Sequence, residues 1–193
     1  MNAFDKGLAV EARGMAVLTP YLRARAKMGQ IVVINKGPLQ SYLQRSVGDA
    51  LMNVSEDRLV SIEVKCESDD QHGNFFLETW SNKNIENRYQ HGERGSTPGW
   101  MLTLRADWLL YYFVEPDDLY IIDFFRLKQW AFGCGDAKPN IERYPERRQG
   151  KYDQRNDTWG RCVPIVDVRS ALGKSIKLAH PAHALSEVDG EAA

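Results

Sequence analysis

Residues 58–67 alternate strictly between apolar and polar side chains. The apolar phase carries Val60, Ile62, Val64 and Cys66, and the polar phase carries Ser61, Glu63, Lys65 and Glu67. Because successive side chains of a strand point to opposite faces, this pattern predicts a β-strand with one face in a core and one face free for chemistry. Residues 49–54 and the polar residues 55–57 predict the first arm and the turn of a hairpin.

Two helices and a short strand are predicted before this hairpin. Residues 1–30 are expected to be helical because apolar side chains recur at helical spacing. The β-branched run over residues 30–35 predicts a short strand. Pro38 suits the first turn of a second helix, and Gly48 is placed to end that helix where the hairpin begins.

Strands and helices are also predicted after the hairpin. Residues 74–81 are aromatic and β-branched, and we expect them to pair with the hairpin as a third strand. Residues 108–114 and 119–123 are nearly continuous apolar runs, which are typical of buried central strands. The other expected elements are an exposed loop or irregular helix over 82–95, a helix from Thr97-Pro98, a helix over 124–132, and a last strand within 161–172.

Length and composition limit the class of protein. The chain has 193 residues, 43% apolar and 26% charged, which favours one globular domain over residues 1–175 with its core at 38–132. The small and acidic residues 176–193 are expected to be a disordered tail. No apolar stretch is long enough for a bilayer and no secretory signal is present, so we expect no membrane partner and a cytoplasmic location. Three widely separated cysteines indicate neither a disulfide framework nor a zinc ribbon.

An acid opens the hairpin, and the triplet Glu63-Val64-Lys65 lies on its second strand between a helix and further strands. This order resembles the PD-(D/E)XK, or restriction-endonuclease-like, nuclease superfamily over residues 38 to about 123. The resemblance implies an α/β (α+β) fold with a central mixed sheet flanked by helices. It also implies that Asp49 and Glu63 hold a divalent metal ion, Mg²⁺ or Mn²⁺, and that Lys65 assists the attacking water.

The resemblance departs from the family at one position before the first acid and offers candidates at another. Gly48 stands where the family usually has proline. The family's preceding helix often carries a Glu or Gln near the metal, and here Gln44 or Gln40 would fill that place.

The spacing of the triplet suits phosphodiester chemistry independently of the resemblance. A strand places Glu63 and Lys65 on one face about 7 Å apart, so both can reach one phosphate. Two carboxylates and a main-chain carbonyl, such as that of Val64, would hold Mg²⁺ and leave room for substrate. The alternative is a solvated polar face, because the triplet alone occurs in many proteins. The acid before it and the apolar strands after it favour the catalytic interpretation.

Glu78 is a candidate third acid, because we expect its strand to pair beside Glu63. The alternative is a carboxylate bound to Arg94 or Arg105. The strings FLETWSN, RGSTPGW, YYF, KYDQ and NDTWGRC also resemble a family of uncharacterised phage and mobile-element proteins that share the E-x-K context. This second similarity indicates a phage or mobile-element origin but does not indicate a substrate.

Basic and aromatic residues elsewhere are candidates for nucleic-acid contact. The net charge of −1 excludes a wholly basic coat protein but leaves a nuclease open, because an enzyme of that class divides its charges over its surface. The segment 147–161 mixes basic and aromatic side chains, as a strand-gripping surface does, although tryptophan more often packs than stacks on bases. The expected nucleic-acid contacts are Lys83, Arg94, Arg148, Lys151 and Tyr152.

These observations lead to three functional hypotheses. The first is a Mg²⁺-dependent or Mn²⁺-dependent nuclease that cuts DNA in phage or mobile-element biology. The second is an inactive protein of the same fold that binds DNA or protein, or acts as an inhibitor. The third is a subunit of a larger nuclease assembly, for which Trp130 and Trp159 would be exposed contact residues. The resemblance also leaves a homodimer open.

Overall fold

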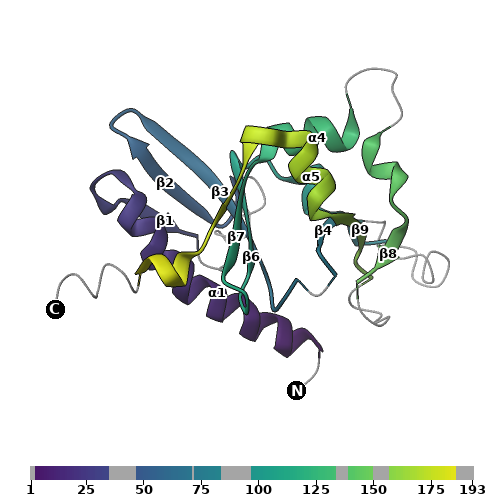
Figure 1. Ribbon diagram of the computed structural model, residues 1–193, viewed down its shortest axis with the longest axis horizontal. Coiled ribbons are helices and arrows are strands. Elements are labelled where there is room, and N and C mark those ends of the chain that lie inside the picture. Colours follow the sequence, from purple (N-terminus) through teal and green to yellow (C-terminus); the bar gives the residue numbers. More distant parts are fainter. Residues whose placement is uncertain are drawn as a thin grey trace. The chain divides into compact units, whose positions relative to one another are not determined.

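The computed structural model describes residues 3–34, 47–70, 72–83, 97–133, 139–149 and 157–185 (Figure 1). The fold is α+β, as expected in its coarse class. The chain divides into two compact units that interleave along the sequence. The first contains residues 1–72, 105–125 and 173–193, and the second contains residues 73–104 and 126–172. We expected one domain over 1–175, and each unit is described separately below.

The first unit is built on a six-stranded mixed sheet in the order β1-β2-β3-β6-β7-β10. Its strands are β1 (Ile31–Val33), β2 (Ala50–Ser55), β3 (Arg58–Glu67), β6 (Trp108–Phe113), β7 (Asp118–Asp123) and β10 (Ile176–Ala179). β2 and β3 form the expected hairpin, with Ala50 opposite Ile62. β3 and β6 run parallel, and the other neighbours are antiparallel. The E-x-K strand therefore lies inside the sheet and is paired on both sides.

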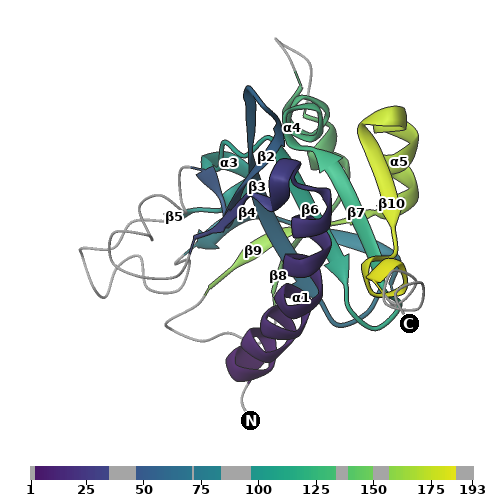
Figure 2. The same cartoon turned by 90° about the vertical axis from the view of Figure 1, so that its left-hand side faces the viewer.

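Helix α1 (Ala3–Arg25) covers one face of this sheet (Figure 2), and a short 3-10 turn, η1 (Lys27–Gly29), follows it. The expected helical spacing is confirmed, since Leu18, Tyr21 and Leu22 are buried. They pack with the apolar phase of β3 and with residues of the neighbouring strands; this core includes Ala50, Met52, Val60, Ile62, Val64, Leu110, Tyr112 and Leu119. The side chains from Leu109 to Phe113 are all buried, which confirms β6 as a central strand.

The second unit contains a four-stranded antiparallel sheet in the order β5-β4-β9-β8. Its strands are β4 (Asn74–Asn82), β5 (Thr97–Pro98), β8 (Glu146–Arg148) and β9 (Trp159–Pro164). β4 exists as predicted, but the expected pairing with the hairpin is wrong. β6 occupies the free edge of β3, because a strand that is apolar on both faces needs an internal position, and β4 pairs with β9 instead.

Short helices lie between the strands of both units. They are α3 (Trp100–Thr103), α4 (Phe124–Phe132), η2 (Asn140–Arg143), α5 (Ile165–Leu172) and η3 (Gly173–Ser175). α4 is confirmed, whereas Thr97-Pro98 forms a strand and the helix begins after Gly99. The last predicted strand, within 161–172, is correct only for β9, since 165–172 are helical. In the described part of the chain, no helix is long and apolar enough to span a membrane.

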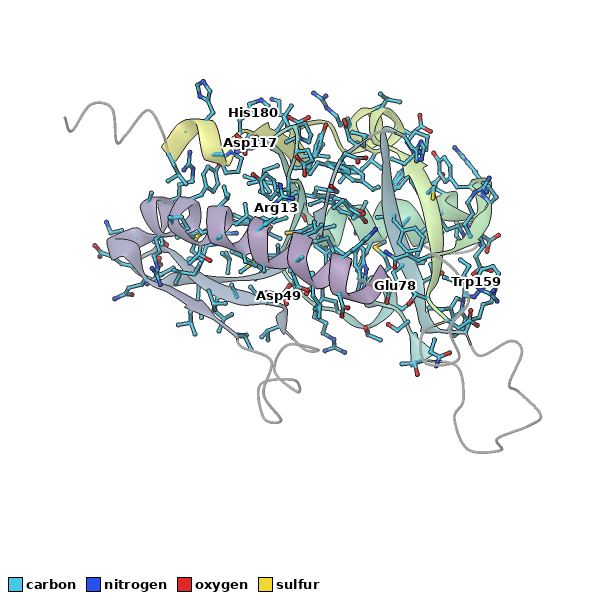
Figure 3. All side chains as sticks on the ribbon, turned by 90° about the horizontal axis from the view of Figure 1, so that it is seen from below. Arg13, Asp49, Glu78, Asp117, Trp159 and His180 are labelled. Carbon is cyan, nitrogen blue, oxygen red and sulfur yellow. The ribbon has the colours of Figure 1, made fainter. Side chains whose placement is uncertain are left out.

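The expected disorder of residues 176–193 is wrong for residues 176–185. Ile176–Ala179 form β10, which pairs with β7, and residues 181–185 are helical. Asp117, in the turn between β6 and β7, holds this segment (Figure 3). Its carboxylate accepts hydrogen bonds from the backbone N–H groups of Ala182 and His183 (2.9 and 3.0 Å) and from the Tyr112 hydroxyl (2.7 Å). Residues 186–193 lie outside the described residues.

Replacing Asp117 with alanine is expected to destabilise the first unit by about 2 kcal/mol or more, because three donors lose their acceptor. Asp117 also has a φ of 58°, a conformation that alanine adopts at a cost. The matched control is Asp117→Asn, which tolerates that φ and keeps one acceptor oxygen, and it should lose less stability. Chemical denaturation measures both variants. An alanine variant as stable as the wild type would contradict this role.

Candidate active site

Gly48 and the hairpin position Asp49. Gly48 is buried and has a φ of 95°, which only glycine adopts readily. A Cβ at this position would lie 2.4 Å from the Ile62 carbonyl oxygen. The proline that the family usually has here could not take this conformation, since its ring holds φ near −65°. Val47 is helical, as the expected helix end requires, while residues 35–46, with Gln40 and Gln44, lie outside the described residues.

The backbone of Asp49 is hydrogen-bonded on both sides. Its N–H donates to the Ile62 carbonyl (2.7 Å), and its carbonyl accepts from the N–H of Ile34 (2.7 Å). In the register of β2 and β3, Ala50 pairs with Ile62, and Asp49 immediately precedes this first paired residue of β2. The Asp49 carboxylate accepts a hydrogen bond from the Val64 N–H (2.8 Å). This acid is therefore held against the E-x-K triplet, as the sequence predicted.

Glu63 and Lys65 form an ion pair on β3, with 2.6 Å between the Lys65 Nζ and a Glu63 carboxylate oxygen. Glu63 is only 5% exposed, although it belongs to the polar phase of its strand. Its neighbours in β6 are apolar and buried, since Glu63 stands beside Leu109 and Lys65 beside Tyr111. A buried carboxylate is costly unless it is paired. The lysine offsets part of that cost and remains accessible, with a third of its side chain exposed.

The donor set suits Mg²⁺ or Mn²⁺ better than a transition metal that prefers nitrogen or sulfur. Asp49, just before β2, and Glu63, on β3, supply carboxylate oxygens. Magnesium commonly uses one or two carboxylates and fills its other positions with water and substrate oxygens. No group of three or more His, Cys, Asp or Glu side chains that could hold a metal ion is found among the described residues. A two-carboxylate site completed by substrate and water fits both findings.

Glu78 does not lie on a strand next to Glu63. β4 belongs to the four-stranded sheet, while β3 pairs with β2 and β6. The Glu78 carboxylate accepts a hydrogen bond from the Ser81 hydroxyl, and its backbone is close to Gly99. The expectation of a third acid on a strand beside Glu63 is therefore wrong.

Two of the expected nucleic-acid contacts, Lys83 and Arg148, come together around Trp159 in the second unit. The Lys83 Nζ lies 4.7 Å and the Arg148 guanidinium 5.1 Å from the centre of the indole ring. Both cations are also paired with acids, Lys83 with Glu146 and Arg148 with the buried Asp157 (2.9 Å). Such pairing lowers the charge that they offer to a phosphate. Arg94, Lys151 and Tyr152 lie outside the described residues.

The tryptophans that would mark a larger assembly are not fully exposed. Trp159 is half-buried, and its indole N–H donates to Asp157 (2.8 Å). Trp130 is also half-buried and packs against the ring of Tyr144. Neither side chain presents the exposed contact surface that the third hypothesis required.

Two groups next to the E-x-K triplet, Cys66 and Glu67, have raised pKa values. Burial raises the pKa of the Cys66 thiol to about 12, and nearby carboxylates, including that of Asp49, add to the shift. The thiol is therefore protonated and unreactive at neutral pH, which agrees with its place on the apolar phase of the strand. Burial also raises the pKa of the Glu67 carboxyl, against a hydrogen bond from the Tyr111 hydroxyl (3.0 Å) that lowers it.

Comparison of the chain with family models, curated proteins and solved structures found no match. The geometry of these residues is therefore the basis for the functional proposal.

Proposed function

We propose that this chain is a divalent-metal-dependent nuclease with a restriction-endonuclease-like core, which hydrolyses phosphodiester bonds in DNA of phage or mobile elements. The observation that carries the proposal is the meeting of Asp49 with the E-x-K triplet. The Val64 N–H binds the Asp49 carboxylate at 2.8 Å, and Lys65 lies 2.6 Å from Glu63. Two acids, one just before β2 and one on β3, and one ammonium are groups suited to metal-assisted phosphodiester hydrolysis.

Asp49 and Glu63 would hold Mg²⁺ or Mn²⁺, with the Val64 carbonyl as a further oxygen donor. The bound ion would acidify a water molecule and offset the charge that develops on the phosphate. The burial of Glu63 keeps competing water from its carboxylate. Lys65 would orient the attacking water or stabilise the phosphate oxygens, because its ammonium is accessible on the same face of β3.

Cleavage of supercoiled, linear duplex and single-stranded DNA in Mg²⁺ or Mn²⁺ tests this proposal. We expect cutting that stops when a chelator removes the metal. Lys65→Ala should lose most of the activity. The control is Lys27→Ala, which changes an exposed lysine of the same unit that pairs with exposed Glu56, and it should retain the activity. A wild-type protein that cuts none of the substrates, or a Lys65→Ala variant that cuts as fast, would contradict the proposal.

One observation favours the second candidate function, an inactive protein of this fold that binds DNA or protein. The Lys65 ammonium already neutralises the Glu63 carboxylate at 2.6 Å, as it would in a site that never takes a metal. Calorimetry with Mn²⁺ separates the two candidates. A protein with an active site should bind Mn²⁺, and the Asp49→Asn variant should lose that binding. A protein in which these residues have only a structural role should show no heat of Mn²⁺ binding.

A further inference from the structure

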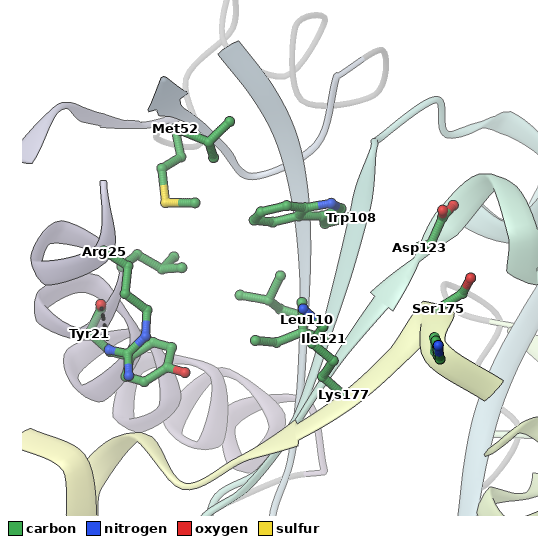
Figure 4. Close-up of a pocket in the computed structure, with 12 residues that line it drawn as sticks. Tyr21, Arg25, Met52, Trp108, Leu110, Ile121, Asp123, Ser175 and Lys177 are labelled. Atoms are coloured by element: carbon green, nitrogen blue, oxygen red, sulfur yellow. Dashed lines mark hydrogen bonds between the residues drawn. The ribbon is translucent and has the colours of Figure 1, made fainter. Parts of the chain in front are cut away.

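The first unit contains a cavity of about 470 Å³ between α1 and the six-stranded sheet (Figure 4). Its apolar walls come from β2, β6 and β7 and include Met52, Trp108, Leu110 and Ile121. This volume lies within the range of small-molecule sites, which are usually apolar with a few polar groups.

The cavity lies on the opposite face of the sheet from the candidate active site. Residues of α1 line it together with Leu110, which belongs to the same core as Val60, Ile62 and Val64 of β3. Glu63 and Lys65 occupy the other phase of that strand and therefore point away from this core. A ligand in the cavity would thus occupy a site separate from Asp49, Glu63 and Lys65.

The charged groups at the cavity favour an anion. Among the described residues that line it are three cations, Arg25, Lys174 and Lys177, and one carboxylate, that of Asp123. Within the described residues, no ion pair involves Lys174 or Lys177. The Arg25 guanidinium lies 3.6 Å from the centre of the Tyr21 ring, which holds the planar group against the wall. A guanidinium fixed in this way is suited to phosphate, which it binds through two parallel hydrogen bonds.

We propose that this cavity binds a nucleoside monophosphate. A phosphate monoester carries close to two negative charges at pH 7. The three cations and one carboxylate among the described lining residues leave the cavity with a net positive charge that complements it. The flat base would pack among Trp108, Leu110 and Met52, where aromatic and aliphatic surfaces replace water. The carboxylate of Asp123 and the hydroxyl of Ser175 offer hydrogen bonds to the sugar hydroxyls. The proposal uses none of the cleavage residues and does not rest on the proposed nuclease function.

Calorimetric titration of the full chain with adenosine and thymidine monophosphates, adenosine and inorganic phosphate tests the proposal. We expect saturable binding of at least one monophosphate, with adenosine and inorganic phosphate each at least tenfold weaker, because the site needs both the base and the charge. Equal affinity for inorganic phosphate alone, or no saturable binding at millimolar concentrations, would overturn it.

Charge-reversal variants of the lysines that line the cavity test whether the monophosphate binds there. Lys177→Glu and Lys174→Glu change exposed side chains and should each weaken monophosphate binding at least tenfold. Lys6→Glu, an exposed lysine of α1 away from the cavity, is the matched control and should bind as the wild type does. Binding that survives both cavity variants would overturn the proposal. Circular dichroism of each variant verifies its fold.

Two further measurements are needed. One distinguishes the end of a nucleic-acid strand from a free nucleotide as the ligand, and the other distinguishes nucleotide binding from the proposed cleavage. A 5′-phosphorylated oligonucleotide that binds more tightly than the mononucleotide identifies the end of a strand as the ligand, and weaker binding identifies the free nucleotide. Glu63→Gln should bind the monophosphate as the wild type does, so that loss of cleavage and loss of nucleotide binding are distinguishable.

Discussion

The Glu63→Gln variant is expected to cleave DNA at least about a thousandfold more slowly than the wild type, a loss of roughly 4 kcal/mol of transition-state stabilisation. Glutamine has the shape of glutamate but lacks the charge that holds a hard divalent cation. The change also removes the acidic partner of Lys65. Single-turnover cleavage rates at fixed Mg²⁺ measure the effect, and Mn²⁺ calorimetry should show weaker metal binding in the same variant.

The matched control is Glu67→Gln, which lies on the same strand and in the same phase as Glu63. The glutamine introduced there can still accept the hydrogen bond of the Tyr111 hydroxyl through its amide oxygen. Because burial raises the pKa of Glu67, the stability linked to its protonated form is present below its unfolded pKa and is lost as pH rises through the folded value. The control should therefore be at least as stable as the wild type at pH 7 and keep its cleavage rate. Equal rates for all three proteins would exclude Glu63 from catalysis.

The elements whose pattern is local could be predicted from the sequence. The alternation of β3 identifies Val60, Ile62 and Val64 as core residues, because side-chain phase depends only on position along the strand. The same phase identifies Glu63 and Lys65 as neighbours. The hairpin register, in which Ala50 pairs with Ile62, then brings the preceding residue, Asp49, to the E-x-K triplet, where its carboxylate accepts the Val64 N–H. The three residues of the candidate site therefore come together through local structure alone.

The choice of distant strand partners could not be predicted in this way. β4 carries a clear strand pattern, yet its partner β9 is about eighty positions away in sequence and its own pattern does not identify it. β10 is short, and two of its four side chains are exposed, so composition alone suggested a disordered tail. Its position at the edge of the sheet brings Lys177 to the cavity. The contribution of Lys177 to that cavity was missed because it follows from this pairing.

The burial of Glu63 could not be predicted from the sequence pattern either. Glu63 belongs to a polar phase, which predicts an exposed side chain, but its neighbour across the parallel pair is the buried Leu109. Parallel pairing with β6 is a non-local contact, so the cost of this buried carboxylate becomes visible only in the fold. In these surroundings the Glu63 carboxylate, paired with Lys65, does not belong to a solvated face.

The Gly48→Ala variant is expected to lose about 3 kcal/mol or more of stability, together with the placement of Asp49. Two costs combine. A residue with a Cβ pays about 1–2 kcal/mol at positive φ, and overlap with backbone forces the chain to shift. The added Cβ would lie 2.4 Å from the carbonyl oxygen and 2.8 Å from the carbonyl carbon of Ile62, and backbone atoms in a paired strand cannot move aside as a flexible side chain can.

Gly173→Ala separates these two costs. Gly173 belongs to the same unit and has a φ of 53°, but a Cβ there would meet nothing within 4 Å. It should therefore lose only about 1–2 kcal/mol, the cost of the backbone conformation alone. Chemical denaturation of both variants gives the comparison, and cleavage by the folded fraction of Gly48→Ala shows whether Asp49 is displaced. Equal losses for the two glycines would mean that Gly48 serves only as a turn residue, and that close contact with β3 does not position the first acid of the site.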